Sequence, residues 1–231
     1  MTTPALVTYS LADGIATLAM DDGKANLMTD AMLGELRAAF DRAETDGAVV
    51  LLTGRERTFS GGFDRNMFAR SRDEILRTLR AGAELVERIF GFPRPVVVAC
   101  NGHCVAQGAF VMLAADVRIG AAGPFKIGLN EVAIGLTIPI YGVEISRARL
   151  STPWFHHATL TGTLYPPEQA LVAGFLDRLV DPAEVLDVAA QEARRLTTID
   201  RSAHAGTKER VRRPALDAIR AGIDRELRLD G

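Results

Sequence analysis

Two short apolar runs, residues 48–52 and 96–100, constrain the fold more than any other part of the sequence. Each run is continuously apolar, which is typical of a strand that is buried on both faces of a sheet. Apolar residues recur at helical spacing over 73–90, and Pro93 and Pro95 then prevent the helix from continuing. This strand–helix–strand order predicts an α/β fold with right-handed crossovers.

The elements on either side of this unit follow from similar patterns. Residues 6–10 and 15–20 are predicted to form a hairpin around Asp13-Gly14. A helix is predicted to begin near Thr29 or Asp30. Further predicted elements are helices beginning at 151–153, 166–170 and 181–182, an extended piece at 175–180, and one or two helices over 201–227. We expect a core over 1–196 and a C-terminal helical region over 197–231.

Composition excludes several classes of function. The 231 residues include 27 basic and 29 acidic side chains, a net charge of −2, so we expect no nucleic-acid partner. No apolar run approaches the ~18 residues of a membrane span, and the first ten residues lack signal-peptide features, so we expect a cytoplasmic protein without a membrane partner. Cys100 and Cys104, with only His103 beside them, predict buried free thiols and no metal site.

The stretch from 101 to 139 carries the predicted chemistry. A flexible, small-residue segment, 102–108, is predicted to lead into an apolar helix, whose N-terminus would present free N–H groups and partial positive charge. Glu131 is the only carboxylate between Asp116 and Glu144, and apolar neighbours favour a raised pKa for its carboxyl group. Together these features predict a site where a carbonyl group is polarised and a proton is moved beside it.

A second glycine-containing segment, TFSGGFD at 58–64, precedes the central helix. Its adjacent glycines, Gly61 and Gly62, permit positive φ and leave backbone N–H groups open to a ligand. The simpler interpretation is a plain tight turn. On the sequence alone, the segment 58–64 is either such a turn or a binding loop.

In order and spacing, four segments together resemble the crotonase superfamily, the enoyl-CoA hydratase/isomerase group, over nearly the whole chain. They are Lys24-Ala25-Asn26, 59–64, 101–116 and 130–139. The resemblance implies a ClpP-like spiral of repeated ββα units. It also implies a C-terminal helical region that packs into homotrimers, often paired as hexamers. An acyl-CoA thioester is the implied substrate, with no separate cofactor.

The same resemblance implies roles for individual residues. The backbone N–H groups of Phe63 and Gln107 are expected to bind the thioester oxygen, and Glu131 is expected to move the proton. Two fixed donors aimed at the enolate oxygen are the arrangement that this chemistry requires. The residues expected to contact acyl-CoA are Lys24, Ala25, Ser60, Gly61, Asp64, Gly108 and Phe110.

Two departures from the family pattern narrow the expected reaction. Hydratases of this family commonly carry two glutamates, but the first falls on Phe110, and the usual glycine triplet reads Ala106-Gln107-Gly108. The string IGLNE at 127–131 resembles the Δ3,Δ2-enoyl-CoA isomerases, in which one base moves a proton between C2 and C4. Isomerisation is therefore favoured over hydration and over acyl-CoA binding without catalysis. The structural alternatives are a capping or ion-pairing role for Glu131 and core packing for Phe110.

The C-terminal segment 201–227 is thinly apolar, so it needs a partner surface in order to form stable helices. The resemblance implies that neighbouring subunits supply that surface. Four basic residues in this segment are expected to form a solvated helix face or, alternatively, to meet CoA phosphates; they are Lys208, Arg210, Arg212 and Arg213.

Overall fold

The two apolar runs form neighbouring parallel strands at the centre of a six-stranded sheet. In the computed structural model, which describes residues 4–228, β3 (Val49–Thr53) pairs with β5 (Val96–Cys100). The full order is β1-β2-β3-β5-β7-β10. The remaining strands are β1 (Val7–Ala12), β2 (Ile15–Met20), β7 (Val117–Ala121) and β10 (Arg178–Val180). The β1–β2 hairpin is antiparallel and the other pairs are parallel, which confirms the predicted hairpin and α/β fold.

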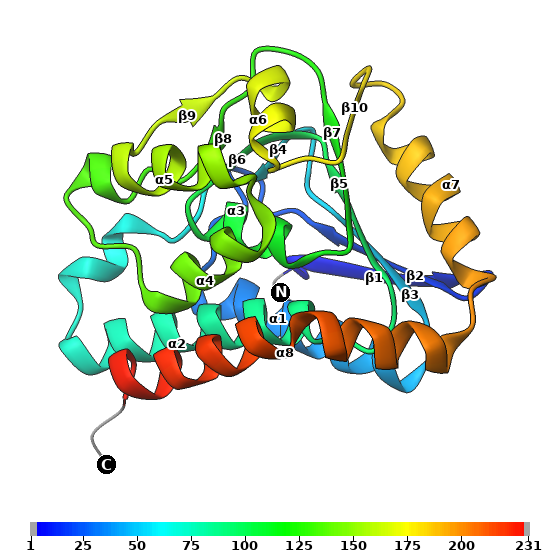
Figure 1. Cartoon of the computed structure of the whole chain (residues 1–231), viewed down its shortest axis with the longest axis horizontal. Coiled ribbons are helices and arrows are strands. Elements are labelled where there is room, and N and C mark those ends of the chain that lie inside the picture. Colours follow the sequence, from blue (N-terminus) through cyan, green and yellow to red (C-terminus); the bar gives the residue numbers. More distant parts are fainter. Residues whose placement is uncertain (1–3, 229–231) are drawn as a thin grey trace.

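The continuous apolar character of β3 and β5 follows from their position between two layers of side chains. Val50, Leu52 and Val98 point into the main core, whereas Leu51 and Val97 point into a smaller core under α7 (Val185–Thr197). Figure 1 shows α7 on one side of the sheet, away from the other long helices. Both faces of these strands are therefore covered by apolar side chains.

A second, four-stranded sheet was not predicted. It consists of β4 (Arg57–Ser60), β6 (Gly102–Val105), β8 (Ile127–Gly128) and β9 (Leu164–Tyr165), in that order. The predicted flexible segment at 102–108 is therefore wrong, because its first half pairs with β4 and β8 and its second half begins a helix. Strands this short contain too few residues to show a periodicity.

Each repeated unit contributes a strand to each sheet and then a helix. The units are β3-β4-α2, β5-β6-α3 and β7-β8-α4, which confirms the expected spiral of ββα units. The helices of the chain are α1 (Asp30–Thr45), α2 (Arg72–Phe90), α3 (Gln107–Ala114), α4 (Ile140–Arg149), α5 (Thr152–Thr161), α6 (Pro167–Ala173), α7 and α8 (Arg201–Glu226), with short 3₁₀ turns η1 (Arg65–Ala69) and η2 (Val132–Ile134). Thr29 caps α1 through its side chain, as predicted.

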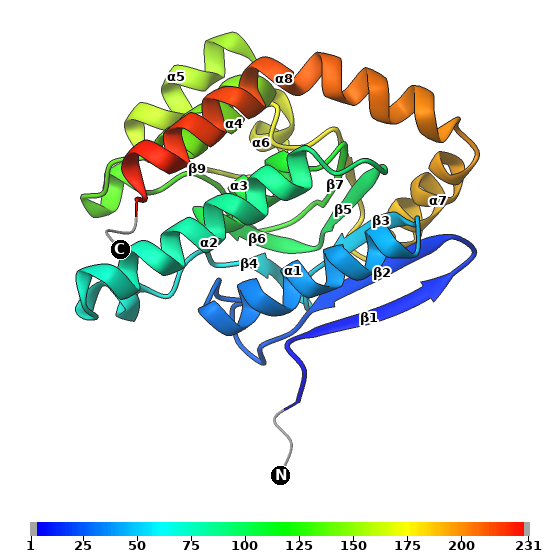
Figure 2. The same ribbon diagram turned by 90° about the horizontal axis from the view of Figure 1, so that it is seen from below.

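The C-terminal segment forms one long helix, α8, that packs on its own chain. It packs against α2 and α4, and Figures 1 and 2 both show it beside them. A Cβ atom on Gly222 of α8 would lie 2.4 Å from Cγ2 of Ile140 in α4, so α8 and α4 are in close contact at this glycine. The partner surface that the sequence required is thus found within the same chain.

Asp116 anchors α8 to the centre of the molecule. Its Oδ2 atom accepts hydrogen bonds from Lys208 Nζ at 2.7 Å and from the Val96 N–H at 2.7 Å, and Arg212 lies 2.9 Å from Oδ1. Burial lowers the pKa of Lys208 to about 8, although the charge of Asp116 opposes this effect. The expectation of a solvated face, or of contacts with CoA phosphates, is therefore wrong for Lys208 and Arg212, which are buried. Arg210 and Arg213 are exposed.

Candidate active site

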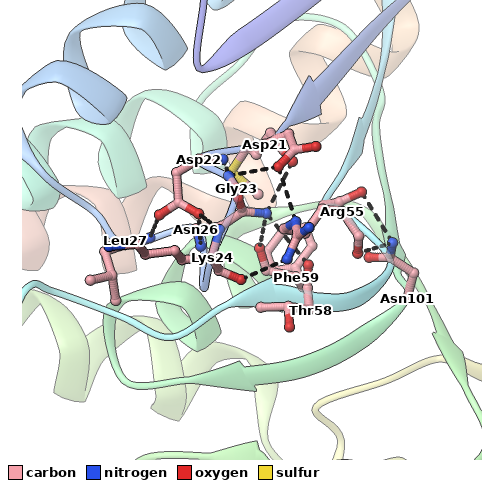
Figure 3. Close-up of polar contacts among 12 residues, drawn as sticks. Asp21, Asp22, Gly23, Lys24, Asn26, Leu27, Arg55, Thr58, Phe59 and Asn101 are labelled. Carbon is pink, nitrogen blue, oxygen red and sulfur yellow. Dashed lines mark hydrogen bonds and ion pairs between the residues drawn. The ribbon is translucent and has the colours of Figure 1, made fainter.

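A buried asparagine organises the first loop of the site, as Figure 3 shows. Asn26 donates hydrogen bonds from Nδ2 to the carbonyls of Met20 at 3.0 Å and Phe59 at 3.2 Å, and its Oδ1 accepts from the Asp22 N–H at 3.0 Å. Its φ of 48° is a conformation that asparagine tolerates better than most residues. Asn26 was noted in the sequence as part of a motif but was not identified as a site residue. The sequence signal for this role is the group of polar residues in the short loop 21–26, where Asn26 follows Asp21 and Asp22.

The rest of this loop holds the backbone of Lys24 in place. The carboxylate of Asp22 accepts from the N–H groups of Lys24, Asn26 and Leu27. Burial opposes the charged form, but these three donors outweigh it and hold the pKa of Asp22 below its ordinary value. Arg55 Nη1 donates to the Lys24 carbonyl at 3.0 Å (Figure 3). The Lys24 side chain itself remains exposed.

The first loop lies directly against the glycine-containing segment 58–64. The Gly61 N–H donates to the Ala25 carbonyl at 2.8 Å, and Ser60 Oγ donates to the Asn26 carbonyl at 2.7 Å. Asp64 caps η1 by accepting from the Asn66 N–H at 2.9 Å. The structure thus brings together the loops that contain Lys24, Ala25, Ser60, Gly61 and Asp64.

The segment 58–64 is also in close contact with the start of α3. A Cβ atom on Gly108 would lie 2.6 Å from the Ser60 Cβ, and one on Gly62 would lie 3.4 Å from the Gln107 nitrogen. Gly62 has a φ of 87°. Two glycine-dependent contacts therefore place the backbone of Phe63, which follows Gly62, near the first residue of α3.

Gln107 begins α3, so its N–H group has no acceptor within the helix. The preceding Ala106 has a φ of 51° and a ψ of −126°, a conformation that residues with a Cβ atom rarely adopt. The Gln107 side chain turns into the protein and is fully buried. Its N–H group thus remains available while its side chain is used elsewhere.

Glu131 is buried without a partner for one of its carboxylate oxygens. It lies immediately before η2, is 7% exposed, and its Oε2 atom makes no hydrogen bond with the described part of the chain. Burial raises the pKa of Glu131 to about 7, and its own N–H only partly opposes this effect. Its side chain caps no helix and forms no ion pair with any residue in 4–228. The capping and ion-pairing interpretations are therefore wrong, and the carboxylate is suited to proton transfer near neutral pH.

Phe110 contributes an apolar ring where the resemblance placed a second glutamate. The ring is 1% exposed and makes an edge contact with Tyr141, with 5.6 Å between ring centroids. A Cβ atom on Gly142 would lie 2.7 Å from the Phe110 Cζ atom, so α4 also closes over the ring. Core packing is therefore part of its role.

A mostly apolar cavity of about 520 Å³ opens beside the η2 turn that follows Glu131. Its lining includes Val132, Leu136, Ile138, Phe155 and Leu160. A separate cavity of about 710 Å³ lies between α1 and α2 and is lined mainly by charged residues. The first of these cavities is lined by residues that follow Glu131 in the chain, beginning with Val132, whereas the second lies against other helices.

Residues 4–228 show neither a metal cluster nor a membrane-spanning helix. This part of the chain has no group of three or more His, Cys, Asp or Glu side chains placed to hold a metal ion. Its helices are also either too short or too polar to cross a bilayer. Cys100 and Cys104 are free and buried, as predicted. His103 accepts a hydrogen bond from the Lys126 N–H at 3.0 Å, which is a structural role.

Comparison with known proteins identifies the family. The model for enoyl-CoA hydratase/isomerase matches residues 10–230. The structure of an enoyl-CoA isomerase from Mycobacterium tuberculosis is 42% identical, with a TM-score of 0.92, covering 95% of this chain and 96% of that chain. An enoyl-CoA hydratase from Mycobacterium marinum is 40% identical, with a TM-score of 0.91 and the same coverage of 95% and 96%.

A human relative extends the similarity beyond bacteria. Mitochondrial enoyl-CoA delta isomerase 1 is 29% identical over 213 residues, which cover 90% of this chain and 70% of that protein. Relatives with both names, isomerase and hydratase, thus match nearly the whole chain. The ββα spiral, the two glycine segments in contact and the match over residues 10–230 show that this chain belongs to the enoyl-CoA hydratase/isomerase family of crotonase-type enzymes.

Proposed function

We propose that this protein is an enoyl-CoA isomerase that moves a double bond from C3 to C2 of an acyl-CoA thioester. The observation that carries the proposal is the single buried Glu131 carboxylate, unpaired at Oε2 and with a pKa of about 7, in a site where Phe110 replaces a second carboxylate. Isomerisation needs one group that accepts a proton at C2 and returns it at C4. Glu131 serves as this base and then as the acid.

The oxyanion is stabilised by backbone groups. Removing a proton from C2 moves negative charge onto the thioester oxygen, and the N–H groups of Phe63 and Gln107 donate hydrogen bonds to it. The contact of Gly62 with the Gln107 nitrogen supports this arrangement, because it places the two backbone segments side by side. A single fixed donor of this kind typically contributes about 10²–10³ in rate. No separate cofactor takes part.

The substrate lies between the first loop and the start of α3. Ala25, Ser60, Gly61 and Gly108 form the closely packed backbone surface beside the thioester, and Phe110 contributes an apolar wall. Lys24 is exposed, so its ammonium group is free to meet the CoA phosphates, while Asp64 fixes the start of η1. All of these residues are proposed acyl-CoA contacts or supports.

Hydration is the alternative activity, since relatives of both names match the chain. A lone glutamate can in principle activate a water molecule. The apolar ring of Phe110 favours isomerisation, because it offers no hydrogen bond to such a water. Acyl-CoA binding without turnover is the third outcome that an assay distinguishes.

Replacing Glu131 tests the proposed activity directly. The wild-type protein is expected to convert a 3-enoyl-CoA into its conjugated 2-enoyl isomer, followed by ultraviolet absorbance and by chromatography with mass detection, without a gain of water. Glu131→Gln keeps the size of the side chain but cannot accept a proton, so turnover should fall by roughly 10²–10⁴ while CoA-ester binding by calorimetry persists. Glu144→Gln is the matched control, because Glu144 pairs with Arg147 at 3.5 Å and has no proposed role. A Glu131→Gln variant that keeps more than about a tenth of wild-type turnover would exclude Glu131 as the base.

The raised pKa of Glu131 predicts two opposite pH dependences. The value of kcat/KM should rise with pH through about 7, as the carboxylate form becomes populated. The free energy of unfolding should fall as the pH rises from about 4.5 to about 7. The folded-state pKa lies above the ordinary 4.5, so in this range the folded protein still holds a proton that the unfolded chain has lost. Between about pH 5 and pH 8, Glu131→Gln should gain roughly 2–3 kcal/mol in free energy of unfolding relative to wild type, at ~1.4 kcal/mol per tenfold change in proton affinity. Urea unfolding at both pH values measures this difference, and a gain of zero would show that Glu131 ionises normally.

Phe110→Glu tests whether this position selects the reaction. A second carboxylate should raise hydratase turnover relative to isomerase turnover, measured as the ratio of hydrated to isomerised product. The buried charge is also expected to destabilise the fold. Circular dichroism therefore accompanies the assay. An unchanged product ratio in a folded variant would show that Phe110 does not decide between the two reactions.

We also propose that the protein assembles as a homotrimer or hexamer. Because α8 packs on its own chain, a different surface is proposed for assembly. Exposed apolar residues lie around the 520 Å³ cavity: Val132 is 43%, Ile134 37% and Leu160 67% exposed. Light scattering at micromolar concentration should give a multiple of three chains, and Leu160→Asp should shift it towards monomer. A monomeric wild-type protein would contradict the proposal.

A further inference from the structure

The buried side chain of Gln107 connects three helices. Its Nε2 atom donates to the Gly82 carbonyl of α2 at 2.8 Å, and its Oε1 atom accepts from the Tyr141 hydroxyl of α4 at 2.7 Å. Gln107 and Tyr141 are 0% and 1% exposed. The residue proposed to supply an oxyanion N–H is thus fixed at both polar ends of its side chain.

The other proposed donor rests on the same point of α2. A Cβ atom on Gly82 would lie 2.5 Å from the Phe63 Cζ atom and 2.9 Å from the Gln107 Nε2 atom. Phe63 and Gln107 are far apart in sequence, yet both side chains contact this one glycine. Because Gly82 has no side chain, the side chains of Phe63 and Gln107 can both pack against its backbone.

The N–H group of Gln107 needs such support because of the residue before it. Ala106 is held at a φ of 51° and a ψ of −126°, and strained backbone of this kind persists only where its surroundings hold it. The Ala106 N–H is fixed by the Gly128 carbonyl at 3.0 Å. The Gln107 side chain provides the second fixed point, on the other side of the strained peptide.

The Tyr141 hydroxyl is the donor in its bond to Gln107, because an amide oxygen can only accept. Burial, together with the negative charges of Glu131 and Glu226, raises the pKa of Tyr141 and keeps its proton in place. Tyr141 also lies at the start of α4, which follows the loop that carries Glu131. Its hydrogen bond to Gln107 therefore connects the start of α3 to α4, the helix that follows Glu131 and η2.

We propose that Tyr141 and Gly82 are positioning residues of the oxyanion hole, which hold the N–H groups of Gln107 and Phe63 in register with the thioester oxygen. This inference rests on the proposed function. It adds that the side chain at position 107 contributes to catalysis through α2 and α4, although only the backbone of Gln107 meets the substrate.

Tyr141→Phe removes only the hydroxyl group and leaves the Gln107 Oε1 atom without its donor. We expect kcat to fall roughly tenfold, less than the 10²–10³ for a missing donor, with little change in KM. A direct readout is the carbonyl stretching frequency of bound hexanoyl-CoA labelled with ¹³C at the thioester carbon, because hydrogen bonds to the oxygen lower this frequency. The shift from free to bound ligand should be smaller in the variant than in wild type.

A double-mutant cycle tests whether Tyr141 acts through Gln107. In a Gln107→Leu background, which keeps the backbone N–H, the further change Tyr141→Phe should have little effect on kcat or on the carbonyl frequency. Gly82→Ala is a second, independent variant, because its methyl group meets both donor residues and should lower kcat by at least tenfold. Gly34→Ala is its matched control, since Gly34 lies in α1 with no atom within 4 Å of an added Cβ, and it should leave turnover unchanged.

The outcomes separate this inference from the function on which it rests. A wild-type protein that neither isomerises enoyl-CoA nor shifts the carbonyl frequency overturns both. If the wild type does both, the inference alone is overturned when folded Tyr141→Phe and Gly82→Ala match the wild type in kcat and frequency, or when the two changes in the cycle are additive. Loss of kcat with a reduced frequency shift and a non-additive cycle supports it.

Discussion

The close approach of two backbone segments, without side chains between them, is the constraint on which the site depends. Gly108 of α3 lies against Ser60 of β4, and Gly62 lies against Ala106 and the Val105 carbonyl. A Cβ atom at either glycine would lie less than 3.0 Å from a neighbouring side-chain atom, so one of the segments would have to move. The contact lies at the end of the β4–β6 pairing and at the start of α3. The site is therefore a consequence of how two ββα units pack, and no single loop forms it alone.

Two carboxylates that are shielded from solvent, Asp116 and Glu131, have opposite surroundings. Asp116 accepts from a backbone N–H and pairs with Lys208 and Arg212, which ties the last helix to the first residues of β5. Glu131 is buried more deeply than the half-buried Asp116, and its Oε2 atom has no hydrogen-bond partner among residues 4–228. A partner would lower the pKa of Glu131 and make it a weaker base. Stability favours the first arrangement and proton transfer favours the second, so the contrast itself points to function.

The sequence predicted the elements whose burial leaves a pattern within a few neighbouring residues. The strands β3 and β5 are apolar because both faces are covered, and the start of α1 at Thr29 and the end of α2 before Pro93 follow local rules. The two-residue strands β8 and β9 have no periodicity to detect. The burial of Lys208 could not be predicted either, because its partner Asp116 is 92 residues away. The motifs indicated Glu131 and the glycine segments, whereas Gly82 and Tyr141 join the site only through tertiary contacts.

In the proposed function, the difference between isomerisation and hydration rests on one position of α3, which is occupied by Phe110. Relatives about 40% identical to this chain are named as isomerase and as hydratase, and one Mycobacterium tuberculosis protein carries both names, so the names do not separate the two reactions. Both reactions require a polarised thioester, which backbone N–H groups supply whatever side chains stand beside them. Only water addition also needs a second polar group to hold the water, and here the position is occupied by the Phe110 ring, packed between Tyr141 and Gly142. Because that ring is part of the core, the proposed preference for isomerisation would follow from the packing of α3 against α4.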